Sequence, residues 1–454
     1  MTEGITILGL GPGDPKQLTL EAWEVLREAK EIYLRTSWHP TVEHLPPHLT
    51  IYSFDRLYEE KETFNEVYEE IAHRIVELGR RPQGVIYAVP GHPLVGEAST
   101  QRILALAEER GLKVRIVQGL SFLEPIFARL SIDPLDGLQI VDATELAIQH
   151  YPHLDPNIPA LVGQLYSRSL ASSVKLTLMN LYPDEHRVTL IRGAGTDEER
   201  VWTVPLYKLD RQDGIDHLTA LYLPPLTDPG SLASLQDVVA HLRAPDGCPW
   251  DRKQTHRSLR PELLEEAYEV LEALDADDAD ELCEELGDLL LEVVFHIQLA
   301  AEAGEFKLPQ VIKGIVTKLK RRHPHVFGKV KVAGVGEVLR RWEEIKREEK
   351  GGKSSPLSGV PKTLPALARA QDLQRRAARV GFNWPDVETT MAEVAEGLRS
   401  LKQTQGKEEL ERATGELLFS LVNLARQLGV DAESALRIAN QRFCQRFAQM
   451  KRFT

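Results

Sequence analysis

The sequence predicts a multidomain protein with an α/β N-terminal region and an all-α C-terminal region. Over residues 1–225, short β-type runs alternate with amphipathic helical segments, which is typical of α/β layering. Beyond the Pro/Gly/Ser-rich break at 223–231, the chain has almost no strand pattern. At 454 residues, it is long enough for two to four domains with hydrophobic cores.

The N-terminal elements follow one another in a regular order. A β-type run at 5–10 leads through the turn GPGDP into an amphipathic helix, and later units repeat the pattern. The remaining segments are a strand at 84–91, a helix at 97–111, and further strands at 113–119, 160–165 and 188–195.

Three glycines, Gly9, Gly11 and Gly13, come directly after the first predicted strand. Glycine there permits a sharp turn or a close approach of the backbone to a ligand. The spacing matches neither the dinucleotide fingerprint nor a P-loop. By itself, the pattern is equally consistent with a simple connection.

The stretch 9–35, GLGPGDPKQLTLEAWEVLREAKEIYLR, resembles the opening of the tetrapyrrole (corrin and porphyrin) methylases. YAVPGHPLVGEAS, at 87–99, is similar to their second glycine loop, and the segments VQGLSFLEPIFARL and LVGQLYSRSLASSVKLTL fit the same family. The resemblance implies two α/β subdomains with S-adenosylmethionine (SAM) held between them.

The same resemblance implies a set of cofactor-cleft residues. His92 departs from the family pattern, which usually has aspartate there, and an imidazole cannot supply a fixed negative charge. A methylase-like fold that has lost catalysis is therefore the alternative. The implied cofactor-binding residues are Pro12, Gly91, His92, Pro93 and Ser121, with Gly195 as a weaker candidate.

Closely spaced carboxylates mark residues 248–304. Residues three or four apart share one face of a helix, so Glu266 pairs with Glu269 and Glu285 pairs with Asp288. If the two helices form an antiparallel hairpin across the acidic turn DADDAD, the four carboxylates converge. Such an oxygen-rich site suits Mg²⁺.

The alternative is that these acids are solvated faces of amphipathic helices. The first helix fits that alternative, with its apolar residues on one arc and its other acids opposite. On the second helix, Glu285, Asp288, Glu292 and His296 form a stripe flanked by Leu289, Phe295 and Leu299, so the acids should face neighbouring protein and need a counter-cation. Geometry alone leaves both interpretations open.

Four motifs in order, CPWDRKQT, EEAYE, ELGDLL and KLKRRHPHVF, resemble the MazG family of nucleoside triphosphate pyrophosphohydrolases. The resemblance implies an all-α fold that uses Mg²⁺ to hydrolyse a nucleoside triphosphate to the monophosphate and pyrophosphate. Glu266, Glu269, Glu285 and Asp288 would be the metal ligands.

The other residues of this predicted site have separate roles. Glu265 is the candidate for orienting or deprotonating the attacking water, because its neighbours hold metal. Trp250 is interpreted either as a stacking partner of the base or as a buried anchor. His296 is expected to be a core residue or a residue that supports a ligand, rather than a Mg²⁺ ligand itself. The basic residues Lys318, Arg321 and Arg322 are expected to bind the β- and γ-phosphates.

The C-terminal segment repeats this pattern in degenerate form. Ala413 and Glu416 stand where the first copy has Glu285 and Asp288, and the EE-x-x-E stretch corresponds best to residues 396–400. This copy should not hold Mg²⁺ well and is expected to be structural. The predicted domains are 1–225 (methylase-like), 226–350 (first MazG-like repeat), 351–365 (linker) and 366–454 (second repeat).

Composition and charge also bear on the binding partners and on the cellular compartment. A net charge of −13 argues against binding a nucleic-acid polymer or a membrane surface. The three scattered cysteines suggest a reducing cytoplasm and no metal cluster, with Cys283 as a small core residue. The N-terminus has no basic n-region and no apolar run reaches the ~18 residues of a membrane helix, so we expect neither a signal peptide nor a membrane span.

Three functional hypotheses follow. The first is a Mg²⁺-dependent pyrophosphohydrolase of nucleoside triphosphates that carries a methylase-like domain. The second is a SAM-dependent methyltransferase whose helical half serves for dimerisation. The third is a non-catalytic scaffold that senses SAM or nucleotide. Both helical repeats are amphipathic, and we expect a homodimer or a higher homo-oligomer.

Overall fold

The computed structural model describes residues 4–349, 357, 359–382 and 384–451. The chain divides into two compact units, Met1–Lys307 and Leu308–Thr454, which are described separately. The first unit holds both β-sheets, the helices that cover them and a further three-helix segment, and the described part of the second unit contains helices and no strand. The predicted fold class is confirmed.

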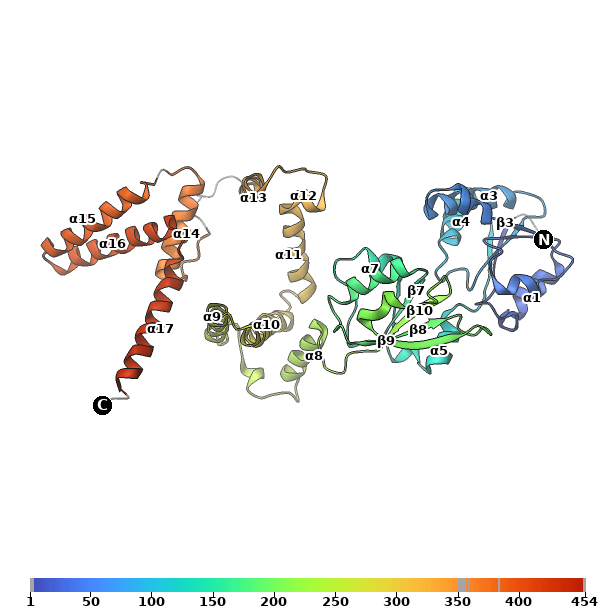
Figure 1. Cartoon of the computed structure of the whole chain (residues 1–454), viewed down its shortest axis with the longest axis horizontal. Coiled ribbons are helices and arrows are strands. Elements are labelled where there is room, and N and C mark those ends of the chain that lie inside the picture. Colours follow the sequence, from blue (N-terminus) through green and yellow to red (C-terminus); the bar gives the residue numbers. More distant parts are fainter. Residues whose placement is uncertain (1–3, 350–356, 358, 383, 452–454) are drawn as a thin grey trace. The chain divides into compact units, whose positions relative to one another are not determined.

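A five-stranded parallel sheet forms the first subdomain, with strand order β3-β2-β4-β1-β5. Parallel strands need crossovers, and here helices supply most of them on the two faces of the sheet (Figure 1). The elements are β1 (Ile5–Gly9), α1 (Leu20–Glu28), β2 (Glu31–Leu34), β3 (Thr50–Ser53), α2 (Asp55–Glu60), α3 (Phe64–Gly79), β4 (Val85–Val89), α4 (Ala98–Glu109) and β5 (Val114–Val117).

Both faces of this sheet are buried, as expected when helices cover a parallel sheet. Every residue of β4 is buried, and β1 is buried at four of its five positions. Side chains of α3 and α4 pack on one face, and α1 covers the other. The carboxyl ends of β1, β4 and β5 therefore form one edge, from which loops leave.

The second subdomain is a mixed sheet with strand order β6-β7-β10-β8-β9, in which only β6 and β7 run parallel. α7 covers one face and α5 the other (Figure 1). The elements are α5 (Leu123–Leu130), β6 (Gln139–Asp142), α6 (Ala143–Ala147), β7 (Ala160–Gly163), α7 (Arg168–Leu178), β8 (Arg187–Arg192), β9 (Arg200–Pro205) and β10 (Thr219–Leu223).

Three helices complete the first unit: α8 (Leu232–Arg243), α9 (Arg260–Ala276) and α10 (Ala279–Glu302). α9 and α10 form an antiparallel hairpin, and α8 packs against α10. Their shared core is small and consists of Val239, Leu259, Val294, Phe295 and Leu299. Much of the apolar surface of the hairpin is therefore left uncovered within the described chain.

The second unit contains α11 (Leu308–Arg322), α12 (Pro324–Phe327), α13 (Val335–Glu349), α14 (Ala366–Arg379), α15 (Val387–Gln403), α16 (Lys407–Gln427) and α17 (Ala432–Lys451). α11 ends at Arg322, two residues before Pro324, which cannot continue a helix. α15 and α16 form a second hairpin, against which α14 packs through α16. The predicted 351–365 connection lies partly outside the described residues.

One burial prediction for the helical half is wrong, because Cys283 is exposed rather than part of a core. On α9, Leu264, Leu271 and Leu274 are exposed as well, while Leu263 is half-buried. The shared core of these helices is small, so periodicity overstates burial at Cys283. None of the described helices combines the length and apolarity needed to cross a bilayer.

We expect Gly9→Ala to destabilise the first subdomain by about 1–3 kcal/mol. A Cβ at Gly9 would lie 2.5 Å from the carbonyl oxygen of Gly91 and 2.8 Å from the backbone nitrogen of Gly119, and backbone cannot move aside cheaply. The measurement is chemical denaturation of the full chain followed by circular dichroism. Gly230→Ala is the control, because a Cβ there meets nothing closer than 3.9 Å. Equal stability of the two variants would contradict this account.

Candidate functional sites

A tight acidic turn sets the geometry of the α9–α10 hairpin. Asp277 ends α9 in the left-handed conformation, with φ 56°, which aspartate tolerates better than most residues. The next residue, Asp278, caps α10 by accepting hydrogen bonds from the backbone N–H groups of Asp280 and Glu281 at 3.1 and 3.2 Å. With only two residues between the helices, α10 returns directly alongside α9.

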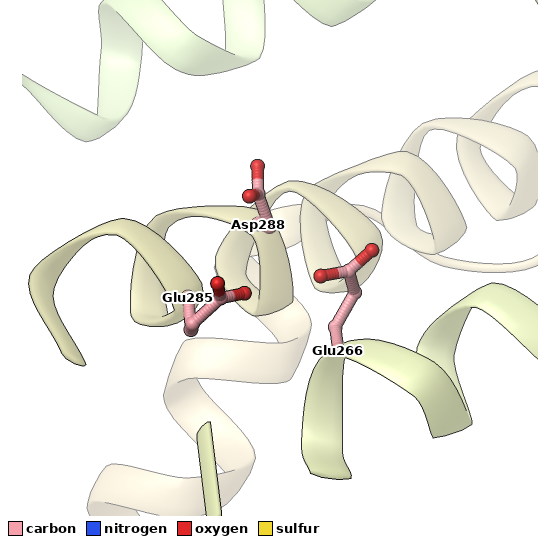
Figure 2. Close-up of side chains that lie close together, drawn as sticks. All are labelled: Glu266, Glu285 and Asp288. Carbon is pink, nitrogen blue, oxygen red and sulfur yellow. The ribbon is translucent and has the colours of Figure 1, made fainter. Parts of the chain in front are cut away.

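This return brings carboxylates of the two helices together (Figure 2). Glu266 on α9 and Glu285 and Asp288 on α10 each offer one oxygen, and these oxygens lie within 4.8 Å of one another. Glu266 and Glu285 are half-buried and Asp288 is exposed. The donor set consists of oxygens alone, which suits Mg²⁺ or Mn²⁺.

The fourth predicted ligand, Glu269, lies beside this group without joining it. It is hydrogen-bonded to Glu266, and its charge acts on both Glu266 and Glu285. Glu265 is exposed on α9 and is not a member of the carboxylate group. The predicted roles of Glu269 as a metal ligand and of Glu265 toward water therefore remain predictions.

Crowding changes the protonation of the cluster. Burial and then the charges of Glu269, Asp288 and Glu285 raise the pKa of Glu266 to about 7. Burial and the neighbouring acids also raise the pKa of Glu285. Among the ion pairs of the described residues, none involves Glu266, Glu285 or Asp288, so the protein itself supplies no cation to offset the repulsion.

The CPWD segment packs at the end of α10. Arg243 of α8 forms an ion pair with Glu302 at 2.7 Å, lies over the ring of Phe295, and donates to the carbonyl of Asp251. Trp250 projects from this loop with 61% of its surface exposed. The interpretation of Trp250 as a buried anchor is therefore wrong. Stacking of Trp250 on a base stays a prediction.

The predicted phosphate-binding residues lie on α11, in the second compact unit. Lys318 is exposed, while Arg321 and Arg322 both form ion pairs with Glu349 of α13. These contacts hold the pKa of Glu349 at about 2, through the hydrogen bond of Arg322 first and then that of Arg321. The ion pairs of both guanidinium groups with Glu349 are not apparent from the sequence pattern.

The predicted cofactor residues gather at one edge of the parallel sheet. The loop after β1 and the loop after β4 are joined by a pair of backbone hydrogen bonds between Gly11 and Gly91, at 2.8 and 3.3 Å. Gly91 has φ +67°, which favours glycine, and Gly119 after β5 lies against the same backbone. Ser121 follows on this third strand end and is buried, with its hydroxyl donating to Glu124 at 2.6 Å.

The other cofactor candidates are placed around these loops. His92 Nδ1 accepts a hydrogen bond from the N–H of Leu94 at 3.1 Å, so the imidazole is used to shape its own loop. Gly195 belongs to the second subdomain, and a Cβ there would lie 2.8 Å from Gln17 in the first. Pro12 and Pro93 lie within the two glycine loops. Loops of both subdomains therefore meet near the GPGDP turn.

The second hairpin differs from the first. α16 carries Ala413 and Glu416, and Glu416 is exposed. On α15, Glu396 forms an ion pair with Arg399 on its own helix. Within the described residues, the carboxylate group of α9 and α10 has no counterpart here.

Comparisons with known proteins cover both halves. The model of the tetrapyrrole (corrin/porphyrin) methylases matches residues 4–210, and the model of the MazG nucleotide pyrophosphohydrolase domain matches residues 254–327. The uncharacterized protein YabN of Bacillus subtilis (strain 168) is 42% identical over 466 residues, covering 99% of this chain and 94% of the relative. The chain belongs to the MazG family, in a form with an N-terminal tetrapyrrole methylase domain.

Two shorter relatives match the helical half of this MazG-family protein. The nucleoside triphosphate pyrophosphohydrolase/pyrophosphatase MazG of Thermotoga maritima is 48% identical over 218 residues, covering 48% of this chain and 84% of the relative. The nucleoside triphosphate pyrophosphohydrolase of Escherichia coli (strain K12) is 46% identical over 226 residues, covering 48% and 86%. The carboxylate group lies within the matched MazG segment.

Metal-free protein should reveal the crowded carboxylate through the pH dependence of its stability. Because folding raises the pKa of Glu266 from 4.5 to about 7, the folded state binds more protons between these pH values, and the free energy of unfolding falls as pH rises. Glu266→Gln removes this contribution, so its stability relative to wild type should increase from pH 4.5 to pH 7. Denaturation in chelator at several pH values measures the difference. Glu272→Gln, at an exposed position, is the control; a pH-independent difference for Glu266→Gln would contradict the prediction.

Proposed function

We propose that this protein is a Mg²⁺-dependent nucleoside triphosphate pyrophosphohydrolase that yields the monophosphate and pyrophosphate. The observation that carries the proposal is the convergence of Glu266, Glu285 and Asp288 from two helices within the MazG segment. The relatives in Thermotoga maritima and Escherichia coli bear the name of this activity. A non-catalytic scaffold would have no need for such costly like-charge crowding.

The residues fit the metal, because three carboxylate oxygens lie close together with no protein cation among their described ion pairs. Glu266, Glu285 and Asp288 would hold Mg²⁺, with Glu269 as the fourth ligand. A Mg²⁺ ion held there would neutralise charge on the phosphates and would lower the pKa of a bound water. The protonation of Glu266 near neutral pH means that metal and proton compete for this carboxylate.

The remaining steps belong to the protein's side chains. A water oxygen attacks the α-phosphorus, the bond between that phosphorus and the α,β-bridging oxygen breaks, and pyrophosphate leaves. Glu265 accepts the proton of the attacking water. Lys318, Arg321 and Arg322 bind the leaving pyrophosphate, which requires the two arginines to exchange Glu349 for phosphate oxygens. Trp250, exposed on its loop, stacks on the base.

Glu285→Gln should lower pyrophosphate release from nucleoside triphosphates in Mg²⁺ by at least about 100-fold, because it removes one charged ligand while conserving side-chain size. Glu416→Gln, at the corresponding region of the second repeat, is the matched control and should retain wild-type activity. A coupled pyrophosphate assay across several nucleotides measures both and gives the preferred substrate. Full activity in Glu285→Gln would exclude this metal site.

We also propose that the N-terminal domain binds SAM at the edge where the β1, β4 and β5 loops meet. The match to the tetrapyrrole methylases and the close backbone packing of Gly9, Gly91 and Gly119 support this site. Pro12, Gly91, His92, Pro93, Ser121 and Gly195 would line it. His92 is committed to the N–H of Leu94, so binding without methyl transfer is the alternative outcome.

SAM should raise the melting temperature of the full chain, and Gly91→Val should abolish that shift. A side chain at Gly91 would have to adopt φ +67° and would protrude into the glycine loops. Gly230→Val, away from these loops, should keep the shift. If Gly91→Val responds to SAM as wild type does, the cofactor binds elsewhere.

The assembly and compartment complete the proposal. Exposed leucines on α9 and α10, together with the apolar stripe Val311, Ile312, Ile315, Val316 and Leu319 on α11, would be covered in a homodimer or higher homo-oligomer. All three cysteines are free, which suits a reducing cytoplasm.

A further inference from the structure

The facing pairs of α9 and α10 continue beyond the carboxylate group. Glu266 faces Asp288, and two turns away Leu259 packs with Phe295 in the core of the hairpin. Further along, His256 and His296 are stacked, with their Nδ1 atoms 2.8 Å apart. Seven residues back from Glu266 to Leu259, the residue before α9, thus match seven residues forward from Asp288 to Phe295, whereas His256 lies further before α9 and departs from this register by two residues. That register places Glu262 opposite Glu292, between the carboxylate group and the apolar pair.

Glu292 and Glu262 are an unusual pair to bury. Glu292 is only 8% exposed, and its Oε2 is fully buried without a hydrogen-bond partner among the described residues. Glu262 likewise has a buried Oε2 with no partner there. Burial and then the charge of Glu262 raise the pKa of Glu292. Two buried carboxylate oxygens, one on buried Glu292 and one on half-buried Glu262, are costly to leave without partners unless something positive lies between them.

The described surroundings do not provide that positive group. No ion pair of the described residues involves Glu262 or Glu292. Arg243, which lies over the ring of Phe295, is engaged by Glu302. The Nδ1 atoms of the two histidines are engaged with each other, and burial and then the charge of His256 lower the pKa of His296, which disfavours a positive charge on His296.

We propose that Glu262 and Glu292 form a second divalent-cation site, distinct from the one at Glu266, Glu285 and Asp288. Each of its two ligands lies four residues, or about 6 Å of helix rise, from a member of the first site. Ions that share one phosphoryl group lie closer, at about 3.5–4 Å. The second ion therefore acts on the hairpin, by joining the first turn of α9 to the middle of α10, and does not take part in the hydrolysis.

The test uses Mn²⁺ alone with the full-length protein, without nucleotide, and counts bound ions by electron paramagnetic resonance of the free Mn²⁺. Wild type should bind one more ion per chain than Glu292→Gln, and Glu285→Gln should also lose one ion while retaining the Glu262–Glu292 site. The double variant Glu285→Gln/Glu292→Gln should lose both. Asp280→Asn, an exposed acid three turns away on α10, is the matched control and should bind as wild type does.

A second readout covers variants that fold poorly. Mn²⁺ should raise the melting temperature of Glu285→Gln by several degrees, and this shift should vanish when Glu262→Gln is added. Unchanged Mn²⁺ stoichiometry in Glu292→Gln would overturn the proposal. The proposal would also be overturned if Glu292→Gln lost the pH dependence of its stability whether or not Mn²⁺ is present, because the pair would then share a proton. This experiment does not measure nucleotide hydrolysis. A negative result for Mn²⁺ binding at Glu262 and Glu292 therefore does not contradict the proposed function, and absence of hydrolysis would not contradict this second site.

Discussion

Repulsion between carboxylates on two antiparallel helices is the constraint on which the helical half depends. Glu266, Glu285 and Asp288 are held within a few ångströms by a two-residue turn, and no ion pair of the described part of the chain brings a cation to them. The folded chain therefore contains electrostatic repulsion that a bound divalent ion or bound protons can reduce. Stability, metal affinity and protonation are linked at this hairpin, and a change in one must alter the others.

The N-terminal domain is constrained by the close approach of three backbone loops. Gly9, Gly91 and Gly119 meet where a single Cβ would collide with backbone atoms, at the carboxyl edge of a parallel sheet. Ligands of open α/β sheets bind at such edges. The close backbone contacts therefore favour glycine at these positions, independently of any family resemblance. His92 shapes the rim of the same region through a hydrogen bond within its own loop.

Much of this organisation could be predicted from local patterns. Periodicity located the strands, the helices and the same-face pairs of acids, because it depends only on helix and strand geometry. The pairing of Glu262 with Glu292 could not be predicted, since it requires the register of the hairpin, and that register is set by Asp277 and Asp278. The ion pairs of Arg321 and Arg322 with Glu349 could not be predicted either, because they depend on the long-range packing of α13 against α11. Burial at Cys283 and Trp250 was not predictable either, because it depends on what packs nearby.

The most direct test of this account is a crystal structure of the full chain grown with Mn²⁺ and a non-hydrolysable nucleoside triphosphate analogue, with anomalous scattering used to locate the metal. The account predicts an anomalous peak bounded by oxygens of Glu266, Glu285 and Asp288, in contact with the phosphates of the analogue. Phosphates bound without metal at this hairpin, or Mn²⁺ bound only in the second repeat, would contradict it.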